Sequence, residues 1–393
     1  MPGWHKATKK LREKGAFQTI GIIQEQHPDR CRLFMQWKKL EFPVLVDSFN
    51  MLGVKVVPMT IAIDEYGIVR HVGIRPGDLE KEFLSKTYSA PGKAPRHKPQ
   101  TAATLRKRAD EKNTSQAWMQ YADALVLENG AKELDAAISA YQSAIALDRS
   151  NGAAYFRVGV AYRMKYDRYN GAVEDFRSAV EHWGKALDLD PNQYIWRRRI
   201  QQYGPRLDKP YPFYDWVRTA RHDIIARGEK PATLRIEPRG AELAQPAKRF
   251  TTSSQGVAEP DPRNQIDRDR SMVLIESAVV PAEVKPGGVL RLHMTFRVNR
   301  GEDVHWNNES GPMEIWIRPL AGWKADPQLV RPKLAGAAQT TEERHAELEL
   351  QVAASADPGV VLVPGYALYF VCRGKDGVCL YRRQDFIVPV TVR

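Results

Sequence analysis

Short apolar runs and helical stripes alternate along residues 1–88. Apolar runs that predict short strands lie at 17–23, 43–47, 59–64 and 68–73. The helix expected over 27–40 begins with Pro28, and one face of it carries Leu33, Phe34, Trp37 and Leu40. A second amphipathic helix is expected at 76–86. Strand, helix, strand, hairpin and helix indicate a compact α/β unit with a mixed sheet.

A helical period with a repeat follows in residues 115–227. The repeated apolar and small positions are Trp118, Leu125, Ala137, Tyr141, Ala144 and Leu147, then Tyr155, Gly159, Tyr162, Ala179, Trp183, Ala186, Leu189 and Pro191. Small residues let one helix approach another, and aromatic residues fill the space beside them. Further helices are expected at 192–207 and 216–226. The preceding residues 89–114, with Pro91, Pro95 and Pro99, indicate a linker that leads into a helix.

The period changes to two from Met272 onward. Apolar residues at even positions from Leu290 to Val298 alternate with polar residues from Arg291 to Arg297, and 345–352 repeat this pattern. About seven short strands over 271–393 predict an all-β sandwich. Residues 228–270 combine proline, glycine and charge with little apolar content, so we expect a partly disordered linker there.

Charge and hydropathy narrow the classes of function. The 393 residues carry a net charge of +12, which suits an acidic or phosphate-rich partner but also a basic, solvated surface. Trp196, followed by Arg197, Arg198 and Arg199, could stack on bases and touch phosphates. No reader motif accompanies these residues, so we expect no nucleic-acid partner and a helix face with Trp196 packed inward. No apolar run reaches the roughly 18 residues of a membrane span.

Cysteine and histidine usage argues against a metal site. The three cysteines, Cys31, Cys372 and Cys379, are too few for a disulfide framework or a four-thiolate zinc site, and the nine histidines lack metal-binding spacing. We therefore expect no metal and no cofactor. Cys31 lies near the start of the expected helix, one turn after His27, where the helix dipole favours a thiolate. This pair is a candidate nucleophile, and simple packing of Cys31 is the alternative.

Residues 42–73 ("FPVLVDSFNMLGVKVVPMTIAIDEYGIVRHVG") resemble the C-terminal part of a thioredoxin-fold domain of the redoxin type. Asp64, Gly67, Ile68 and Val69 match the hairpin of that fold, and Pro58 falls at its cis-proline, which lies beside the reactive thiol and helps to hold the substrate chain. In that family a first strand and a C-x-x-C motif should precede Trp4, and this sequence holds neither. Either the domain is truncated at its N-terminus or it is a redox-dead remnant.

Two further resemblances concern the rest of the chain. The spacing of small and aromatic residues in 115–227, closed by "ALDLDPN", resembles tetratricopeptide repeats, which implies a groove that binds a protein partner. Residues 366–390 ("YALYFVCRGKDGVCLYRRQDFIVPV") resemble the N-terminal, immunoglobulin-like domain of DsbD-type thiol–disulfide reductases, whose reactive cysteine pair spans adjacent strands. That resemblance implies that Cys372 and Cys379 are such a pair.

The residues themselves leave the state of this pair open. Asp376–Gly377 is a turn signal, so Cys372 and Cys379 can face each other across a hairpin. They could form a structural disulfide, a redox-active pair or two free thiols. A disulfide indicates an oxidising compartment, whereas the N-terminus "MPGWHKATKKLREKG" lacks the apolar core of a signal peptide and reads as cytoplasmic. A missing N-terminal segment would explain why this sequence shows neither an export signal nor the C-x-x-C motif.

The sequence therefore predicts a multidomain chain in five parts. These are a truncated thioredoxin-like α/β domain (1–88), a linker (89–114), an all-α tetratricopeptide-like array (115–227), a second linker (228–270) and a DsbD-like, all-β immunoglobulin-like sandwich (271–393). The expected function is thiol–disulfide or peroxide redox chemistry, with a protein partner bound by the repeats. The alternative is a non-enzymatic tetratricopeptide scaffold that carries a redox-dead thioredoxin-like domain. The compartment stays open between cytoplasmic and extracytoplasmic.

Overall fold

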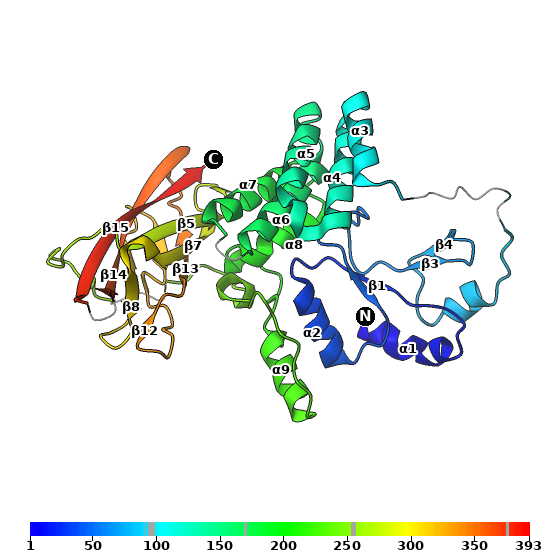
Figure 1. Ribbon diagram of the computed structural model, residues 1–393, viewed down its shortest axis with the longest axis horizontal. Coiled ribbons are helices and arrows are strands. Elements are labelled where there is room, and N and C mark those ends of the chain that lie inside the picture. The colour runs from blue at the N-terminus through cyan, green and yellow to red at the C-terminus, as the bar shows by residue number, and fades with distance from the viewer. Residues whose placement is uncertain (91, 93–98, 169–170, 253–256, 375–376) are drawn as a thin grey trace. The chain divides into compact units, whose positions relative to one another are not determined.

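The chain folds into both helices and β-sheets. Figure 1 shows its computed structural model. The structure describes all residues except 91, 93–98, 169–170, 253–256 and 375–376. Two compact units can be separated. The first comprises Met1–Asp167, Lys185–Arg197 and Asp215–Glu237, and the second comprises Arg168–Gly184, Arg198–Tyr214 and Pro238–Arg393. The protein is therefore a mixed α and β chain with more than one compact unit, and each unit is described by itself.

The first unit holds the N-terminal strands and most of the helices. Its elements in chain order are α1 (Pro2–Glu13), β1 (Gly21–Ile23), α2 (Pro28–Lys38), β2 (Val44–Val46), β3 (Ile61–Ile63), β4 (Val69–Val72), η1 (Glu80–Leu84), α3 (Ala102–Lys112), α4 (Ser115–Asn129), η2 (Gly130–Glu133), α5 (Leu134–Leu147), α6 (Gly152–Tyr166) and α9 (Trp216–Ala226). Helices α7 (Val173–Leu189) and α8 (Tyr194–Tyr203) give residues to both units. The four strands and the helix expected before residue 74 are confirmed, each shorter than its apolar run. The helix expected at 76–86 is reduced to the π-helical turn η1.

The N-terminal strands form two separate pairs. β1 and β2 are parallel and are joined through α2, whereas β3 and β4 are antiparallel. Asp64 closes the β3–β4 turn, because its carboxylate accepts hydrogen bonds from the amides of Tyr66 and Ile68 and from the Arg70 side chain. Burial alone would raise the pKa of Asp64, but these hydrogen bonds lower it. Gly67 completes the turn with a φ of 80°, where a side chain would be strained.

The apolar faces of these strand pairs are only partly covered. Ala62 belongs to a small core with Ile74, Leu79 and Phe83. Several apolar side chains on the same four strands are exposed, among them Ile22 (44%), Leu45 (57%), Ile63 (55%) and Val72 (67%). The strands are therefore well defined by their pattern, yet much of the surface that the pattern marks as apolar faces solvent.

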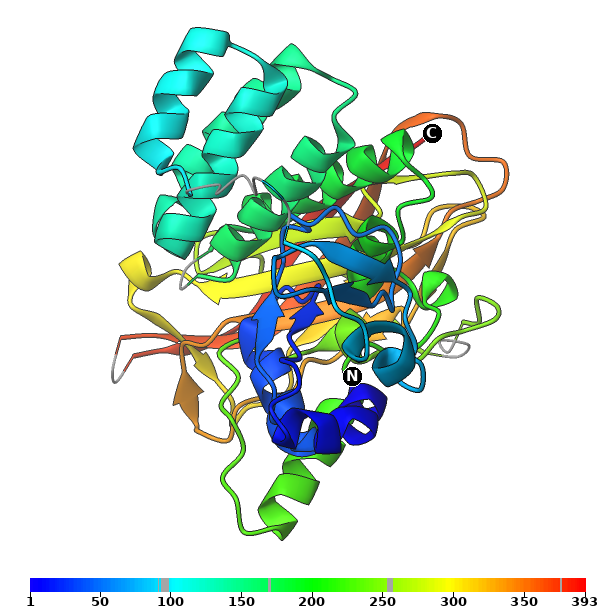
Figure 2. The same cartoon turned by 90° about the vertical axis from the view of Figure 1, so that its right-hand side faces the viewer.

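Helices of the first unit pack on one another and on the N-terminal residues. The apolar face predicted for α2 is confirmed: Leu33 is buried, and Phe34 and Trp37 contact Trp216 of α9, which stacks on Trp37 at 5.9 Å. Helices α3 to α6 each pack against the next along the chain (Figure 2). Arg157 of α6 pairs with Asp123 of α4 at 2.6 Å and also donates to the carbonyl oxygen of Phe49. This guanidinium therefore fastens the loop after β2 to the helices.

The second unit is built around two sheets. Its remaining elements are η3 (Arg206–Asp208), η4 (Gly240–Leu243), β5 (Val273–Val280), β6 (Glu283–Val284), β7 (Val289–Val298), η5 (Arg300–Glu302), β8 (Val304–Asn307), β9 (Glu314–Ile317), β10 (Lys324–Asp326), β11 (Leu329–Val330), β12 (Gln339–Thr340), β13 (Arg344–Gln351), β14 (Gly359–Arg373) and β15 (Cys379–Val392). One sheet has the order β10-β13-β7-β5, and the other has the order β11-β9-β14-β15-β6. β8 pairs with the C-terminal end of β14, past the stretch of β14 that pairs with β9, and β12 pairs with β8. More strands form than the seven expected. Three of them, β6, β11 and β12, are only two residues long.

Apolar side chains from both sheets form one core. Leu290, Leu292, Met294 and Phe296 of β7 lie in it, as the alternation predicted, together with Trp306 of β8 and Val371 of β14. Because residues of the two sheets interdigitate in the same cluster, the sheets pack face to face. Within the range expected to be a linker, 228–270, the turn η4 is described and Ala241 and Glu242 are buried.

The polar face of β7 and β13 is covered rather than solvated. Its charged side chains Arg291, His293, Glu347 and Glu349 are largely buried. Together with Asp326 of β10 and the partly exposed Arg206 of η3 they form a layer of ion pairs, called here the charged layer. Arg291 donates to Glu347 at 2.7 Å and to Glu349 at 3.0 Å. Phe176 of α7 and the carbonyl oxygen of Tyr203 in α8 contact His293. Segments from α7 and α8 therefore close the outer side of this sheet.

Two further residues pack closely against the charged layer. Gly240 has a φ of 48°, and a Cβ atom there would lie 2.0 Å from the Glu347 carboxylate. Burial lowers the pKa of Lys209 to about 7, and its ammonium donates to the carbonyl oxygen of Gln202 at 3.0 Å. Burial alone would raise the pKa of Glu347, but His293 and Arg291 lower it well below its usual range.

Candidate functional site

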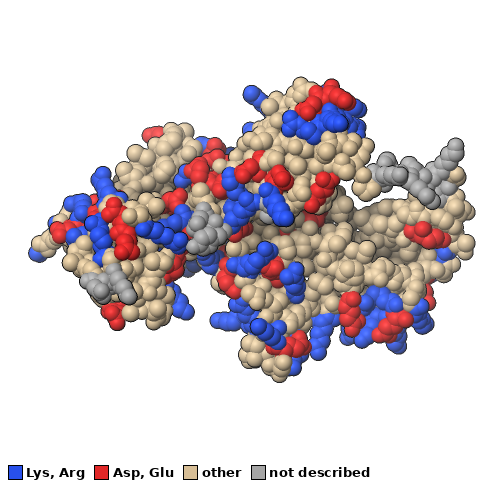
Figure 3. Space-filling model, viewed as in Figure 1, with Lys and Arg blue, Asp and Glu red and all other residues tan. Residues whose placement is uncertain are grey.

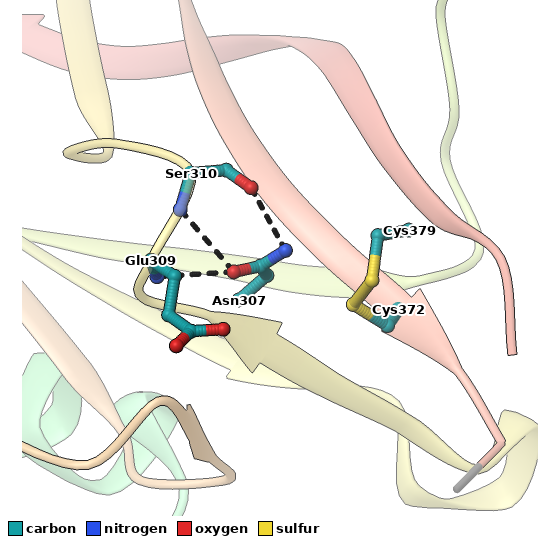
Figure 4. Close-up of a disulfide and its surroundings, with 5 residues drawn as sticks. All are labelled: Asn307, Glu309, Ser310, Cys372 and Cys379. Atoms are coloured by element: carbon teal, nitrogen blue, oxygen red, sulfur yellow. Dashed lines mark hydrogen bonds between the residues drawn. A yellow bond between two sulfur atoms is a disulfide. The ribbon is translucent and has the colours of Figure 1, made fainter. Parts of the chain in front are cut away.

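Cys372 and Cys379 form the last pair of the β14–β15 hairpin. They lie directly opposite each other in the register and are joined by a disulfide (Figure 4). Of the three states that the sequence left open, the structure contains the disulfide. Cys372 is buried at 2% exposure, whereas Cys379 is exposed. Asp376 of the expected turn lies outside the described residues.

A third residue extends this pair across the sheet. β8 runs antiparallel to β14 on the side away from β15, and its His305 lies directly opposite Cys372. Directly opposed residues of an antiparallel sheet share one face. His305, Cys372 and Cys379 therefore form a single row, with the buried cysteine in the middle.

The His305 imidazole has an unsatisfied nitrogen in this row. Its Nε2 atom is buried and has no hydrogen-bond partner among the residues that the structure describes. A buried polar group of this kind costs about 1–3 kcal/mol. Sequence reasoning missed His305, because only the strand register brings it next to Cys372.

Aromatic and glycine residues flank the disulfide along the same face. Phe370 and Tyr381 form the next register pair on this face, two residues along each strand, and their rings stack at 4.3 Å. Gly311, in the loop between β8 and β9, has a φ of 148°, and a Cβ atom there would lie 3.2 Å from the Phe370 ring. A glycine at this position lets the loop approach the ring closely. Burial raises the pKa of the Tyr381 hydroxyl, and Glu314 and Asp261 raise it further.

The loop after β8 is held by its own side chains. The Asn307 carbonyl oxygen accepts hydrogen bonds from the amides of Glu309 and Ser310, and its amide group donates to the Ser310 hydroxyl at 2.9 Å (Figure 4). These bonds fix the loop beside the disulfide. The Glu309 side chain lies on the same loop and is exposed.

Cys31 lies in the first unit, in the first turns of α2. It is buried at 4% exposure, and burial raises the pKa of its thiol to about 11, with a further increase caused by Glu25. This direction is opposite to the thiolate expected from the helix N-terminus, so desolvation outweighs the helix dipole. His27 is the residue that precedes the helix, and its Nδ1 atom lies 3.5 Å from the Asp167 carboxylate.

Pro58 lies in the first unit before β3. The Val57–Pro58 peptide bond is cis, and Pro58 itself is exposed. Two residues on, Thr60 donates a hydrogen bond from its hydroxyl to the carbonyl oxygen of Ile74 at 2.7 Å.

The helical region carries a shallow pocket of about 210 Å³ on α3, α4 and α5. Arg106 lies over the rings of Trp118 and Tyr121, at 5.0 and 5.4 Å from their centres, and is held by Asp110 at 2.9 Å. Small residues of α5, among them Ala136 and Ser139, form its other wall. The pocket therefore presents two aromatic faces and one guanidinium.

Trp196 and residues of the arginine run that follows it pack against other side chains of the protein. Trp196 is buried and stacks on Phe156 at 5.7 Å, as expected for a ring packed inward. Arg199 is buried and lies over the ring of Trp183. On the face shown in Figure 3, basic and acidic side chains are interleaved.

Membrane-spanning helices and metal sites are both absent from the described residues. No helix there is both long and apolar enough to cross a bilayer. No group of three or more histidine, cysteine, aspartate or glutamate side chains in that part of the chain is arranged to hold a metal ion.

Comparisons with known proteins give no family. No protein-family model matches the chain, and no curated protein matches it. A solved structure described as "AvmM Catalyzes Macrocyclization in Alchivemycin A Biosynthesis" is 10% identical and covers 31% of this chain and 89% of its own, with a TM-score of 0.20. BcpA, the major pilin subunit of Bacillus cereus, is 11% identical over 30% of this chain and 39% of its own, with a TM-score of 0.19.

A third similar structure is Spo0M, a sporulation control protein from Bacillus subtilis. It is 8% identical and covers 31% of this chain and 49% of its own, with a TM-score of 0.17. The chain thus spans less than half the length of the BcpA and Spo0M chains. Likeness at these TM-scores carries no information about the fold or function of this chain.

Proposed function

We propose that the protein exchanges thiols and disulfides with a protein partner through Cys372 and Cys379. The observation that carries this proposal is the asymmetry of the pair: one sulfur belongs to an exposed residue and the other to a buried one. Thiol–disulfide exchange requires an incoming thiolate to reach one sulfur and displace the other. A disulfide that served only to close the hairpin would gain nothing from this exposure.

The exchange balances as a two-step transfer from a partner dithiol. A partner thiolate attacks Sγ of Cys379, a mixed disulfide forms, and Cys372 leaves as a thiolate. The second thiolate of the partner then attacks the partner sulfur in the mixed disulfide, and Cys379 leaves as a thiolate. The partner ends as a disulfide, and the two cysteines of this chain end as thiols after taking up two protons. In the opposite direction the same steps oxidise the pair.

The predicted domain identities are part of the proposal. The two facing sheets with a disulfide at the end of a hairpin support an immunoglobulin-like, DsbD-like domain at 271–393. The parallel β1–α2–β2 unit followed by the β3–β4 hairpin supports a thioredoxin-like remnant at 1–88, and the successive packed helices support a tetratricopeptide-like array at 115–227. A disulfide of this kind is typical of an oxidising, extracytoplasmic compartment.

A redox titration tests the proposal directly. The Cys31→Ser variant leaves two cysteines, and it is equilibrated in glutathione redox buffers, trapped with iodoacetamide and weighed by mass spectrometry. We expect the folded protein to open and close the pair reversibly at potentials above about −300 mV, the range of exchangeable disulfides. A pair that stays oxidised in the folded protein and opens only in denaturant would refute the exchange function.

The scaffold function is the second candidate, and the pocket of Arg106, Trp118 and Tyr121 favours it. Aromatic and arginine side chains are enriched where proteins bind one another. We propose that a protein segment docks there, with or without exchange at the disulfide. Photocrosslinkers placed at Trp118 and, as a control, at Leu127, which is 73% exposed on the same helix, distinguish the two sites. Equal crosslinking from both positions in the native host would argue against the pocket.

A further inference from the structure

The disulfide row contains a group that the exchange itself does not yet use. His305 lies opposite the buried cysteine, on the face that carries both sulfur atoms. Opposed residues of an antiparallel pair have their Cβ atoms about 5 Å apart, so the imidazole of His305 is within reach of the Cys372 sulfur. Its buried Nε2 atom has no hydrogen-bond partner among the described residues while the disulfide is intact.

We infer that His305 gives a proton to the Cys372 thiolate when the disulfide opens and takes it back when the disulfide closes. The inference rests on the proposed exchange at Cys372 and Cys379. A disulfide sulfur is a weak acceptor, whereas a thiolate is a strong one. The nitrogen that lacks a partner in the oxidised protein therefore gains one when Cys372 becomes the leaving group.

The proton balance is simple. A partner thiolate attacks Sγ of Cys379, the S–S bond breaks, and the electron pair goes to Sγ of Cys372. The His305 imidazolium transfers its Nε2 proton to that sulfur and becomes neutral imidazole, and its partly exposed ring recovers a proton from solvent. On reoxidation the neutral imidazole removes the proton from Cys372, whose thiolate then attacks the mixed disulfide and displaces the partner thiolate.

Burial makes this role useful. Cys372 is 2% exposed, so water has poor access to its sulfur, and an uncompensated thiolate there is costly. A hydrogen bond to a charged group contributes about 1.5–3 kcal/mol, and general acid catalysis typically contributes at least 100-fold. The exposed Cys379 needs no such help, because solvent reaches it.

Few charged groups lie on the described segments next to His305. On its far side, β8 is paired with Gln339 and Thr340 of β12, which are uncharged. The charged groups on the adjoining segments are Glu302, Asp303, Glu309 and Arg373, of which Glu302 and Arg373 form an ion pair.

The test measures how fast dithiothreitol reduces the native disulfide in the Cys31→Ser background between pH 5.5 and 8.5. Rates are divided by the concentration of dithiothreitol thiolate. We expect the corrected rate to rise as the pH falls when His305 is present, and to be flat and about 100-fold lower at pH 6 in His305→Gln and His305→Phe. His222→Gln removes an exposed histidine of α9 and should match the parent protein.

The outcomes separate this inference from the proposed function. If dithiothreitol reduces the parent protein and His305→Gln has the same pH profile, the inference is wrong and the exchange function stands. If the folded parent is not reduced at all, the exchange function fails whatever the variants do. Should the variants not fold, NMR titration of the parent decides: the pKa of His305 should be higher in the reduced than in the oxidised protein, and equal values would overturn the inference.

Discussion

The two strand-rich regions of the molecule treat their faces in opposite ways. In the N-terminal strand pairs, apolar residues such as Leu45 and Val72 are more than half exposed. In the sheet of β7 and β13, even the charged residues Arg291 and Glu349 are buried. The sequence pattern alone would suggest the reverse for both regions. Polarity along a strand therefore shows which residues share a face, and it does not show whether that face meets water.

The charged layer explains how a polar face can be buried. Each charged group in it has an oppositely charged or hydrogen-bonding partner, as with the buried Arg291, which pairs with Glu347 at 2.7 Å and Glu349 at 3.0 Å. Buried charges are tolerated when they are paired in this way. The exposed apolar side chains of β1 to β4 need no such pairing to lie at the surface, but together they leave apolar strand surface that favours association.

The strongest test of the contrast truncates one apolar strand side chain in each region. Phe296 is fully buried between the sheets, so Phe296→Ala should lower the free energy of unfolding of the second unit by about 3–5 kcal/mol. Ile63→Ala is the matched change at an exposed strand position, and it should have an effect within about 0.5 kcal/mol. Urea unfolding with hydrogen exchange on β7 and β3 peptides measures both. Equal losses would contradict the difference between the regions.

The charged layer should be the next most sensitive feature. Glu347→Gln removes the negative charge that Arg291 and His293 share, and we expect a loss of about 3 kcal/mol at pH 7. Because the folded pKa of Glu347 lies below its unfolded value, its contribution is present above about pH 4.5 and is lost as the pH falls further. Urea titrations at pH 7 and pH 4 should show the parent approaching the variant in acid. A constant difference between the two would argue against a buried carboxylate.

A smaller effect is expected where the backbone lies close to this layer. Gly240→Ala places a methyl group against the Glu347 carboxylate and strains a positive φ, which together should cost about 2 kcal/mol. Gly228→Ala is the control, because its φ of 77° is also positive but the space around it is open. Thermal unfolding should therefore show a larger loss for Gly240→Ala. Equal losses would mean that strain alone is responsible.

The smallest effect is expected on the exposed strands. Leu45→Thr on β2 should change the free energy of unfolding by less than about 0.5 kcal/mol, since little apolar area is lost from a core. It should also reduce self-association, because exposed apolar strand surface promotes it. Light scattering at increasing protein concentration checks this. A loss above 2 kcal/mol would show that the β1–β2 face is covered in solution.

Local patterns were enough to predict most elements. The apolar runs at 43–47 and 68–73 became β2 and β4, and the helix expected at 216–226 is α9. The alternation from Leu290 to Val298 correctly marked the core face of β7. These successes share a cause, because each depends on residues that are close in sequence.

Features that depend on distant partners could not be predicted. Trp216 was assigned to the helical array, and its packing on Trp37 of α2 follows only from the fold. The burial of Arg291 could not be predicted, because its partners Glu347 and Glu349 lie on another strand. Cys372 and Cys379 were found from the sequence as close neighbours on a hairpin. His305 was missed because nothing local links it to a cysteine on another strand.

The way the chain alternates between the two units has a practical consequence for dissecting the protein. A fragment cut at the predicted boundary before residue 271 would keep both sheets but lose Arg206 of the charged layer, together with Phe176 and Tyr203, which contact His293 of that layer. Arg291, Glu347 and Glu349 would then face solvent, on a sheet whose outer side is normally covered by segments of α7 and α8. We therefore expect residues 271–393 alone to be destabilised, and a fragment that keeps the charged layer covered should begin before α7.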